Sequence, residues 1–531
     1  MRSLEKNKLL LFPFLMGTML MVYSWYLSYP LSIDSLDDFV FNHVSPLYWF
    51  SLALLLASMY VMGVNAKSGL LKWAITVGIV MTMYSLSYFY YMLPGSDSHY
   101  FRGLTEYFIE KTYPVPSKPY HTYFEWPSFF LLNSMATSLS GLRLAYFEFM
   151  LYAIIGFLFV TALYVYVAKA HRDSGFLAVV SYFIMMFYFL NYQWAPFSLG
   201  FGLLLLLLML ETRIAESQGK TLMTLILFTG VSFTHTFLPL FFVLYQLVRY
   251  LLSRSERCLR TILLTITIYF ATQLLQAPLS FAVNIKIMMY ASPEWAQIVE
   301  ATLAPAWVPL DKVAQTFSRF VVIVTTIVCG AGFVVLLIKR KLRLLDKAIL
   351  LSGAIYSALG TLVPILGSRA IPLVFIPVSL GASHLSESRF GSYLKSFFLV
   401  LLILFLFVPL HTSFYDSQIM FQTNEAYQAE NFMIDRYDWR ESSLILAHLR
   451  VVTYLQAKQP YVAQFEDDVF TLLPRIEECD SIVYTVGLGK NLLRDDYAKG
   501  RMLREQLNVV YNNGSSYIAT KSSDFTWAPA D

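Results

Sequence analysis

The 531-residue chain is 57% hydrophobic and only 14% charged, and its mean hydropathy is +0.55. A soluble protein has about one quarter charged residues, so this composition indicates a chain embedded in a lipid bilayer. The net charge is +4, and the Lys and Arg residues are dispersed over short loops, which argues against a nucleic-acid-binding surface. The three cysteines show no C-x-x-C spacing and indicate neither a disulfide framework nor a zinc site.

The N-terminus begins with the basic stretch MRSLEKNK, and a long apolar run follows it. No small-residue cleavage site comes after this run, so we predict a retained membrane span and not a cleaved signal peptide. Further apolar runs of about 17 to 25 residues predict about thirteen spans in all. They begin near residues 9, 47, 73, 142, 175, 196, 221, 236, 260, 319, 347, 370 and 393.

The basic residues occur in alternate loops, which predicts the orientation of the chain. The run KRKLR at 339–343 is on the basic side, whereas the loop SIDSLDDF at 32–39 and the turns at 191–196 and 233–237 carry no Lys or Arg. Cytoplasmic loops are enriched in Lys and Arg, so we expect a cytoplasmic N-terminus. An odd number of spans then places the C-terminal region outside a cell membrane.

Two predicted external loops are too long to be simple turns. The first covers residues 94–126. The second, at 278–318, combines Met, Trp, Ile and Pro with few charges, and we expect it to lie along the membrane surface as interfacial helices and a mobile loop.

The composition becomes polar from about residue 412. The runs SSLILA, DSIVYTVG and NVVYNNGSSYIAT predict strands, the segment YAKGRMLREQL predicts a helix, and N-N-G is a hairpin-turn signal. The expected fold is therefore an α-helical polytopic membrane domain at 1–411 followed by a small extracytoplasmic α/β domain at 412–531.

Polar residues gather in the first long loop, where burial near the membrane makes ionisable groups informative. The loop opens with Asp97, His99, Arg102 and Glu106, and its closing segment holds Lys118, Tyr120, His121, Glu125 and Trp126.

The order of features in residues 94–142 resembles the first catalytic loop of the GT-C superfamily of membrane glycosyltransferases. An apolar span is followed by G-S-D-S-H-Y, an amphipathic helix, a Pro-rich turn with Lys and Tyr, F-E-W-P-S, a second helix and S-G-L. The C-terminal region also looks like the external domain of prokaryotic, especially archaeal, members. The resemblance covers the loop closely and the multi-span body loosely.

This resemblance implies a glycosyltransferase with a polyprenyl-phosphate-linked sugar as donor and a glycan, lipid or protein acceptor on the outer side. It implies that Asp97 is the general base, which takes a proton from the acceptor hydroxyl during an inverting attack on the anomeric carbon. The residues of this loop that we expect to bind substrate are His99, Arg102, Lys118, Tyr120, His121 and Glu125. Glu125 could equally have a structural role and pair with Arg102 or Lys118.

Other residues are also candidates for the catalytic carboxylate. The superfamily usually carries this residue after the first span, whereas Asp97 follows the third. Asp34, Asp37 and Asp38 occupy that alternative position. A base needs a polar partner and a site that can be shielded from water. Asp97 has His99 and Arg102 close in sequence and a long aromatic loop after it, which favours Asp97. A helix N-cap is a compatible structural role for the same residue.

His99 has three possible roles: a ligand with Asp97 for a divalent cation such as Mg or Mn, an acceptor contact, or an interfacial polar residue. Two ligand-type residues at i and i+2 form a weak metal signal.

A polyprenyl-phosphate leaving group requires a nearby cation. Arg369, predicted in an external turn that opens a span, resembles an Arg associated with lipid-phosphate binding in the superfamily, while a snorkelling interfacial Arg remains open. Lys118 and Arg319 are weaker candidates. His235, in a tight external turn, is either a structural histidine or a donor contact.

Three other classes of protein are alternatives to this glycosyltransferase. An oligosaccharyltransferase would carry W-W-D-x-G in its external domain, and this chain has no such motif. A transporter is disfavoured because no pair of interrupted helices suggests inverted repeats. A non-catalytic scaffold with the same fold stays open.

Overall fold

The computed structural model describes most of the membrane domain and five C-terminal strands. The described residues are 2–29, 44–89, 96–111, 126–169, 175–187, 195–213, 218–278, 309–362, 364–389, 391–409, 444–446, 464–466, 481–486, 508–512 and 516–520.

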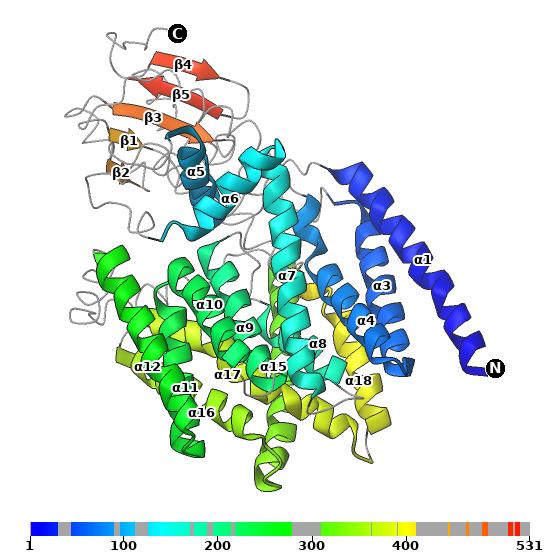
Figure 1. The fold of residues 1–531 in the computed structure, drawn as a ribbon. Coiled ribbons are helices and arrows are strands. Elements are labelled where there is room, and N and C mark those ends of the chain that lie inside the picture. Colours follow the sequence, from blue (N-terminus) through cyan, green and yellow to red (C-terminus); the bar gives the residue numbers. More distant parts are fainter. Residues whose placement is uncertain are drawn as a thin grey trace.

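Helices joined by short connections make up the larger part of the molecule (Figure 1). Each of the thirteen predicted apolar segments overlaps one helix, so the positions of these helices are confirmed, while the number of membrane crossings stays a prediction. The helices are α1 (Arg2–Ser28), α3 (Pro46–Asn65), α4 (Gly69–Met83), η1 (Ser85–Phe89), α5 (Ser96–Lys111), α6 (Ser128–Ser140), α7 (Leu144–Ala168), α8 (Gly175–Met186), α9 (Pro196–Arg213), α10 (Gln218–Thr234), α11 (Phe237–Ser253), α12 (Glu256–Ala271), η3 (Thr272–Gln276), α15 (Pro309–Ile338), α16 (Leu344–Leu362), α17 (Pro364–Ser386) and α18 (Gly391–Leu404).

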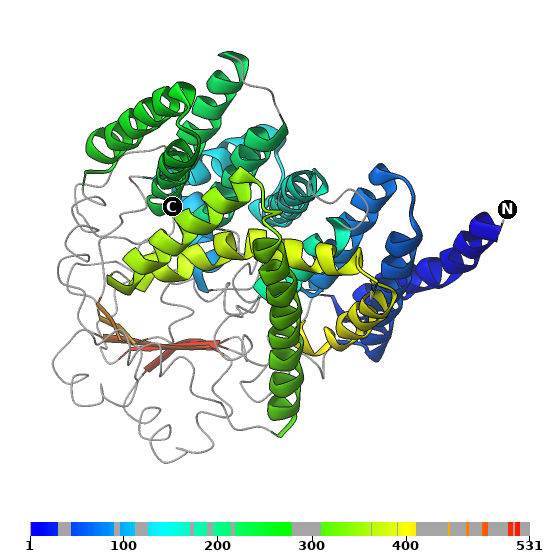
Figure 2. The same cartoon turned by 90° about the horizontal axis from the view of Figure 1, so that it is seen from below.

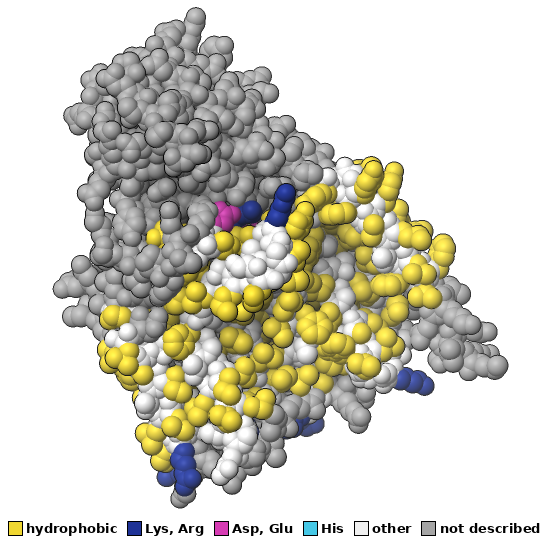
Figure 3. Space-filling model, turned by 45° about the horizontal axis from the view of Figure 1, so that its top comes forward, with side chains coloured by type: hydrophobic (Ala, Val, Ile, Leu, Met, Phe, Trp, Pro, Cys, Tyr) yellow, Lys and Arg dark blue, Asp and Glu magenta, His cyan; other side chains and the backbone are white. Residues whose placement is uncertain are grey.

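Five helices within the described residues are long and apolar enough to cross a bilayer. These segments are Leu11–Ser28, Pro46–Asn65, Leu144–Ala168, Thr316–Ile338 and Gly391–Pro409. Their outward faces expose large apolar side chains, for example Met19 at 73% and Ile327 at 63%. Figure 3 shows a continuous hydrophobic surface with Lys and Arg at its borders. Such a surface would be costly in water and is expected in lipid, so the protein is a multi-pass membrane protein.

Helix α8 forms the centre of the bundle. All of its residues are buried, and it packs against α4, α7, α15 and α17. The sequence GFLAVVSYFIMM explains this position, because a helix that is apolar on every side is suited to burial on every side. Its Tyr182 hydroxyl donates a hydrogen bond of 2.9 Å to the Pro372 carbonyl of α17, which satisfies the buried polar group.

Helices α15 and α17 cross at two glycines (Figure 2). A methyl group built on Gly332 would collide with the backbone of Gly381, and one built on Gly381 would collide with the Cys329 carbonyl. Small residues at such crossings let two helix backbones approach closely in a membrane. Gly330, one of the glycines of α15, has no neighbouring atom in that position.

The C-terminal strands form one sheet with the order β2-β1-β3-β5-β4. The strands are β1 (Leu444–Leu446), β2 (Gln464–Glu466), β3 (Ser481–Val486), β4 (Asn508–Asn512) and β5 (Ser516–Thr520). Strand β1 is parallel to β2 and β3, and β5 is antiparallel to β3 and β4. The strands predicted at SSLILA, DSIVYTVG and the N-N-G hairpin are confirmed. The predicted helices of this region lie outside the described residues.

The sheet lies at the end of the helical bundle that also carries α5 and α6, and the N-terminus lies toward the other end (Figure 1). Several helices begin well before the predicted apolar runs, and two of these helices begin at a proline. Helix α15 begins at Pro309 and not near 319, and α17 begins at Pro364 and not near 370. Proline is favoured in the first turn of a helix, where its missing N–H has no partner to lose, and this preference explains both earlier starts.

The glycine crossing predicts different effects for two similar substitutions in α15. Gly332→Ala should lower the free energy of unfolding by about 1–3 kcal/mol, because the added methyl group overpacks the contact with α17. Gly330→Ala is the matched control and should leave stability unchanged or raise it. The measurement is thermal unfolding of the purified protein in detergent. Equal melting temperatures for the two variants would contradict the close crossing.

Candidate functional site

The short helix η1 leads directly into the segment that contains Asp97. Three helices hold it in place. The Trp25 indole N–H of α1 donates to the Tyr88 carbonyl at 2.9 Å, the Tyr152 hydroxyl of α7 donates to Ser87 Oγ at 3.1 Å, and Tyr48 of α3 lies 3.1 Å from Ser85 Oγ.

These contacts anchor the start of the loop to the bundle. Burial raises the pKa of the Tyr88 hydroxyl above its ordinary value, so this side chain stays neutral.

Asp97 and His99 lie in the first turn of α5, which begins at Ser96. Ser and Asp are common at helix N-termini, and a carboxylate near this end interacts favourably with the helix dipole. The helix therefore starts at the S-D-S sequence as predicted, with Asp97 as its second residue, while an N-cap role for Asp97 stays a prediction. The side chains of both residues lie outside the described part of the chain, so their chemical roles stay predictions.

Arg102 joins α5 to α7 through a buried cluster of charges. Its Nε donates to Glu106 Oε1 at 3.1 Å, and its Nη1 lies 3.6 Å from Glu148 Oε2. Arg102 is 5% exposed and Glu148 is 2% exposed. Buried charges require opposite charges as partners, so this cluster fixes α5 one helical turn beyond Asp97. Figure 3 shows acidic and basic side chains together at the upper border of the hydrophobic surface.

Aromatic rings complete the attachment of α5. Phe101 packs against Phe129 and Phe130 of α6, with ring centroids 6.3 and 5.9 Å apart, and Phe108 stacks on Phe130 at 5.7 Å. Each such ring buries a large apolar area, and edge-to-face and offset pairs add to the attraction. Helix α6 ends at Gly141, whose φ of 66° is a conformation that glycine adopts without strain. The two helices predicted in the 94–142 segment are thus present and packed together.

The other predicted site residues are Lys118, Tyr120, His121, Glu125, Arg369 and His235. The first four lie outside the described residues. Arg369 lies inside α17 and not in a turn, because α17 begins at Pro364; its side chain is outside the described part.

His235 connects α10 to α11. Its Nδ1 accepts a hydrogen bond of 3.1 Å from the Phe237 N–H, and its ring lies 5.4 Å from that of Phe197. The backbone N–H groups at the start of a helix have no partner within the helix, and His235 accepts a hydrogen bond from one of them at the N-terminus of α11. The structural interpretation of His235 therefore has a physical basis, and a donor contact stays a prediction.

Glu148 is the residue of this site that the sequence reasoning did not single out. It lies near the start of the apolar segment LAYFEFMLYAIIGFLFV, and an acidic residue in such a segment is an available signal of a functional or paired position. Its Oε1 has no hydrogen-bond partner among the described residues. Within the same part of the chain, no group of three or more His, Cys, Asp or Glu residues is placed to hold a metal ion.

Comparisons with known proteins give structural similarities alone. No protein-family model and no curated protein matches the chain. Two solved structures of ArnT from Cupriavidus metallidurans are similar to it. The apo structure has 11% identity and a TM-score of 0.45, covering 87% of this chain and 100% of that one. The structure with bound undecaprenyl phosphate has 10% identity and a TM-score of 0.43, covering 88% and 100%.

The archaeal oligosaccharyltransferase AglB from Archaeoglobus fulgidus is also similar, in a complex with an inhibitory peptide and a dolichol-phosphate. The identity is 11% and the TM-score 0.46, covering 90% of this chain and 74% of that one. At TM-scores below 0.5, these similarities assign neither a function nor matching residues to this chain.

The buried cluster predicts that Arg102 is needed to keep α5 in place. Arg102→Met leaves Glu148 buried without its counter-charge, and such a change costs about 3–5 kcal/mol. We expect faster hydrogen exchange in residues 96–111 and a lower melting temperature. The double variant Arg102→Met/Glu148→Met should recover part of the loss.

Arg143→Met is the control, because Arg143 is exposed and lies just before α7. The cluster would have no anchoring role if Arg102→Met and Arg143→Met behaved alike, or if the double variant showed the sum of the separate losses from Arg102→Met and Glu148→Met.

Proposed function

We propose that the protein is an integral membrane glycosyltransferase that moves a sugar from a polyprenyl-phosphate donor to an acceptor on the external face. One observation carries the proposal. The helix that begins with the Asp97 motif is held against the end of an apolar helical bundle by buried ion pairs and aromatic packing. A lipid-linked donor reaches such a position from the bilayer, and an acceptor reaches it from the external side.

Asp97 is the general base in this proposal. It accepts the proton of the acceptor hydroxyl while that oxygen attacks the anomeric carbon, and the bond from this carbon to the polyprenyl-phosphate oxygen breaks. A single displacement of this kind inverts the configuration at the anomeric carbon. The resemblance of the 94–142 segment to GT-C catalytic loops supports this role, and the location of the backbone of Asp97 in the first turn of an anchored helix is compatible with it.

The other residues take supporting roles. Arg102 positions α5, because it lies in a buried contact with two carboxylates. We assign the donor phosphate to Arg369, and acceptor or sugar contacts to His99, Lys118, Tyr120, His121, Glu125 and His235. No step of this mechanism requires a metal ion, and Mg or Mn bound by Asp97 and His99 stays a subsidiary hypothesis.

The proposed topology follows from the loop charges. Thirteen crossings would place the N-terminus in the cytoplasm and the C-terminal α/β domain outside the cell membrane. The long loops at 94–126 and 278–318 would then lie on the same side as that domain, where they could enclose the acceptor.

The test of the base is turnover by the full-length protein with polyprenyl-phosphate sugars, followed by release of lipid phosphate. Asp97→Asn should lower the rate by about 10²–10⁴-fold, the usual effect of losing a general base. Asp37→Asn and Asp38→Asn are the controls and should retain activity. Unchanged turnover in Asp97→Asn would reject the assignment. Absence of turnover with every donor, in a protein that folds, would favour the non-catalytic scaffold or a transporter.

The role of Arg369 makes a separate kinetic prediction. Arg369→Gln should raise the KM for the lipid donor and lower kcat, because the arginine stabilises the phosphate both before and after the glycosidic bond breaks. Arg389→Gln removes a charge beyond the other end of α17 and is the control. A KM for the donor that is equal in the two variants would show that Arg369 does not contact the phosphate.

A further inference from the structure

A cavity of about 700 Å³ lies among the ends of α7, α15, α16 and α17. Lys169, which follows the lower end of α7 in Figure 1, is part of its lining, so the cavity is at the end of the bundle opposite α5 and α6. The proposed glycosyl transfer does not use this end of the molecule. On the loop-charge prediction, this end faces the cytoplasm.

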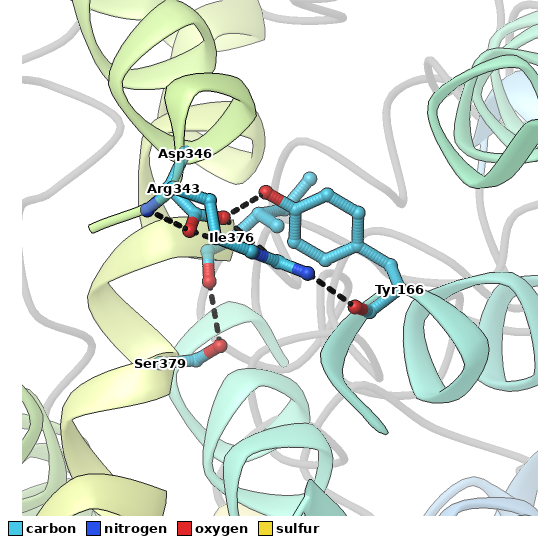
Figure 4. Close-up of polar contacts among 5 residues, drawn as sticks. All are labelled: Tyr166, Arg343, Asp346, Ile376 and Ser379. Atoms are coloured by element: carbon cyan, nitrogen blue, oxygen red, sulfur yellow. Dashed lines mark hydrogen bonds and ion pairs between the residues drawn. The ribbon is translucent and has the colours of Figure 1, made fainter. Parts of the chain in front are cut away.

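The wall of the cavity contains a fixed arginine. The Arg343 side chain donates two hydrogen bonds to the Asp346 carboxylate, at 2.9 Å from Nε and 2.8 Å from Nη2, and a third of 3.2 Å to the Tyr166 carbonyl. The Tyr166 hydroxyl also donates to Asp346, and the guanidinium lies over the tyrosine ring at 4.7 Å (Figure 4). Asp346 is 1% exposed. This network makes one side of the cavity rigid.

The turn that ends α15 fixes the positions of two lysines in the cavity wall. The N–H of Arg340 donates to the Leu337 carbonyl and that of Lys341 to the Leu336 carbonyl, with a left-handed φ of 53° at Arg340. This hydrogen-bond pattern is the Schellman motif that ends many helices. It gives the turn a defined shape, and it places Lys339 and Lys341 in the cavity wall while Arg340 lies outside the lining.

The charges of the lining favour an anion. Four cations, Lys169, Lys339, Lys341 and Arg343, line the cavity together with two carboxylates, those of Asp346 and Glu387. Asp346 engages Arg343 and Glu387 offsets one further charge, so the four cations and two carboxylates leave a net positive lining. His384 is also part of the wall.

Apolar side chains share the cavity wall with these cations, namely Leu336, Leu342 and Leu380. The opposite face of α15 exposes Val334, Leu337 and Ile338 at 50%, 43% and 75%, which places this end of the helix beside lipid. An anionic lipid head group in the cavity would therefore have the bilayer within reach for its acyl chains. Basic cavities between membrane helices on the cytoplasmic side commonly bind anionic lipid head groups.

We propose that this cavity binds the phosphate of an anionic phospholipid, whose acyl chains extend into the surrounding bilayer. The proposal is independent of the glycosyltransferase activity, because its residues are at the other end of the bundle. It also gives a function to the KRKLR segment beyond setting orientation.

Binding of fluorescent phosphatidylglycerol to the full-length protein in phosphatidylcholine nanodiscs tests the proposal. Lys339→Gln/Lys341→Gln should weaken the apparent affinity about thirtyfold, because each lysine near an anionic head group contributes a factor of about five. The control pair, Arg340→Gln/Lys347→Gln, removes the same charge from residues outside the lining and should change the affinity less than threefold. Thermal unfolding of all variants separates lost binding from lost folding.

Three outcomes would overturn the proposal. Equal weakening by the two pairs would indicate diffuse attraction to surface charge. Inorganic phosphate that competes with the lipid at the lipid's own concentration would indicate a free-phosphate site. Phosphatidylcholine that binds as tightly as phosphatidylglycerol would show that the anionic phosphate is not recognised.

Discussion

Pairing of buried charges is the constraint on which this membrane fold depends. An ionisable side chain removed from water loses several kcal/mol of solvation unless an opposite charge and hydrogen bonds replace the water. The described residues include three such clusters. Besides the groups around Arg102 and Arg343, the Glu211 carboxylate of α9 contacts Lys220 of α10 and Arg249 of α11. Each cluster joins elements distant in sequence and therefore fixes the end of a helix.

The clusters lie near the two ends of the helices, and the interior between them is apolar. Helix α8 has no charged residue, and the α15–α17 crossing depends on backbone contact at glycine. This division leaves the two ends free to differ. One end carries a long loop anchored by a single arginine and two glutamates, whereas the other carries several lysines around a cavity. Chemistry at the first end and lipid binding at the second would then be compatible in one bundle.

Much of the fold follows from simple patterns in the sequence. The apolar runs place every predicted helix of the membrane domain, since length and hydropathy suffice to define a helix that lipid surrounds. The N-N-G sequence predicts the β4–β5 hairpin, because Asn and Gly favour tight hairpin turns, and the two strands pair antiparallel. The starts of α15 and α17 are less predictable, since a proline there can either end a loop or begin a helix. For this reason Arg369, which was predicted in a turn, lies in a helix.

The candidate site is only partly predictable, because its key contact joins residues far apart in sequence. Arg102 stands out in the motif, but nothing in the 94–126 segment shows that its partner is Glu148 in the next long helix. That contact changes the expected role of Arg102. A donor phosphate beside it would also meet two carboxylates, and their repulsion would offset the attraction of the guanidinium. In the proposed mechanism the phosphate therefore requires a cation elsewhere at the same end of the bundle. Arg369, early in α17, is assigned to that role because it would leave the attachment of α5 undisturbed.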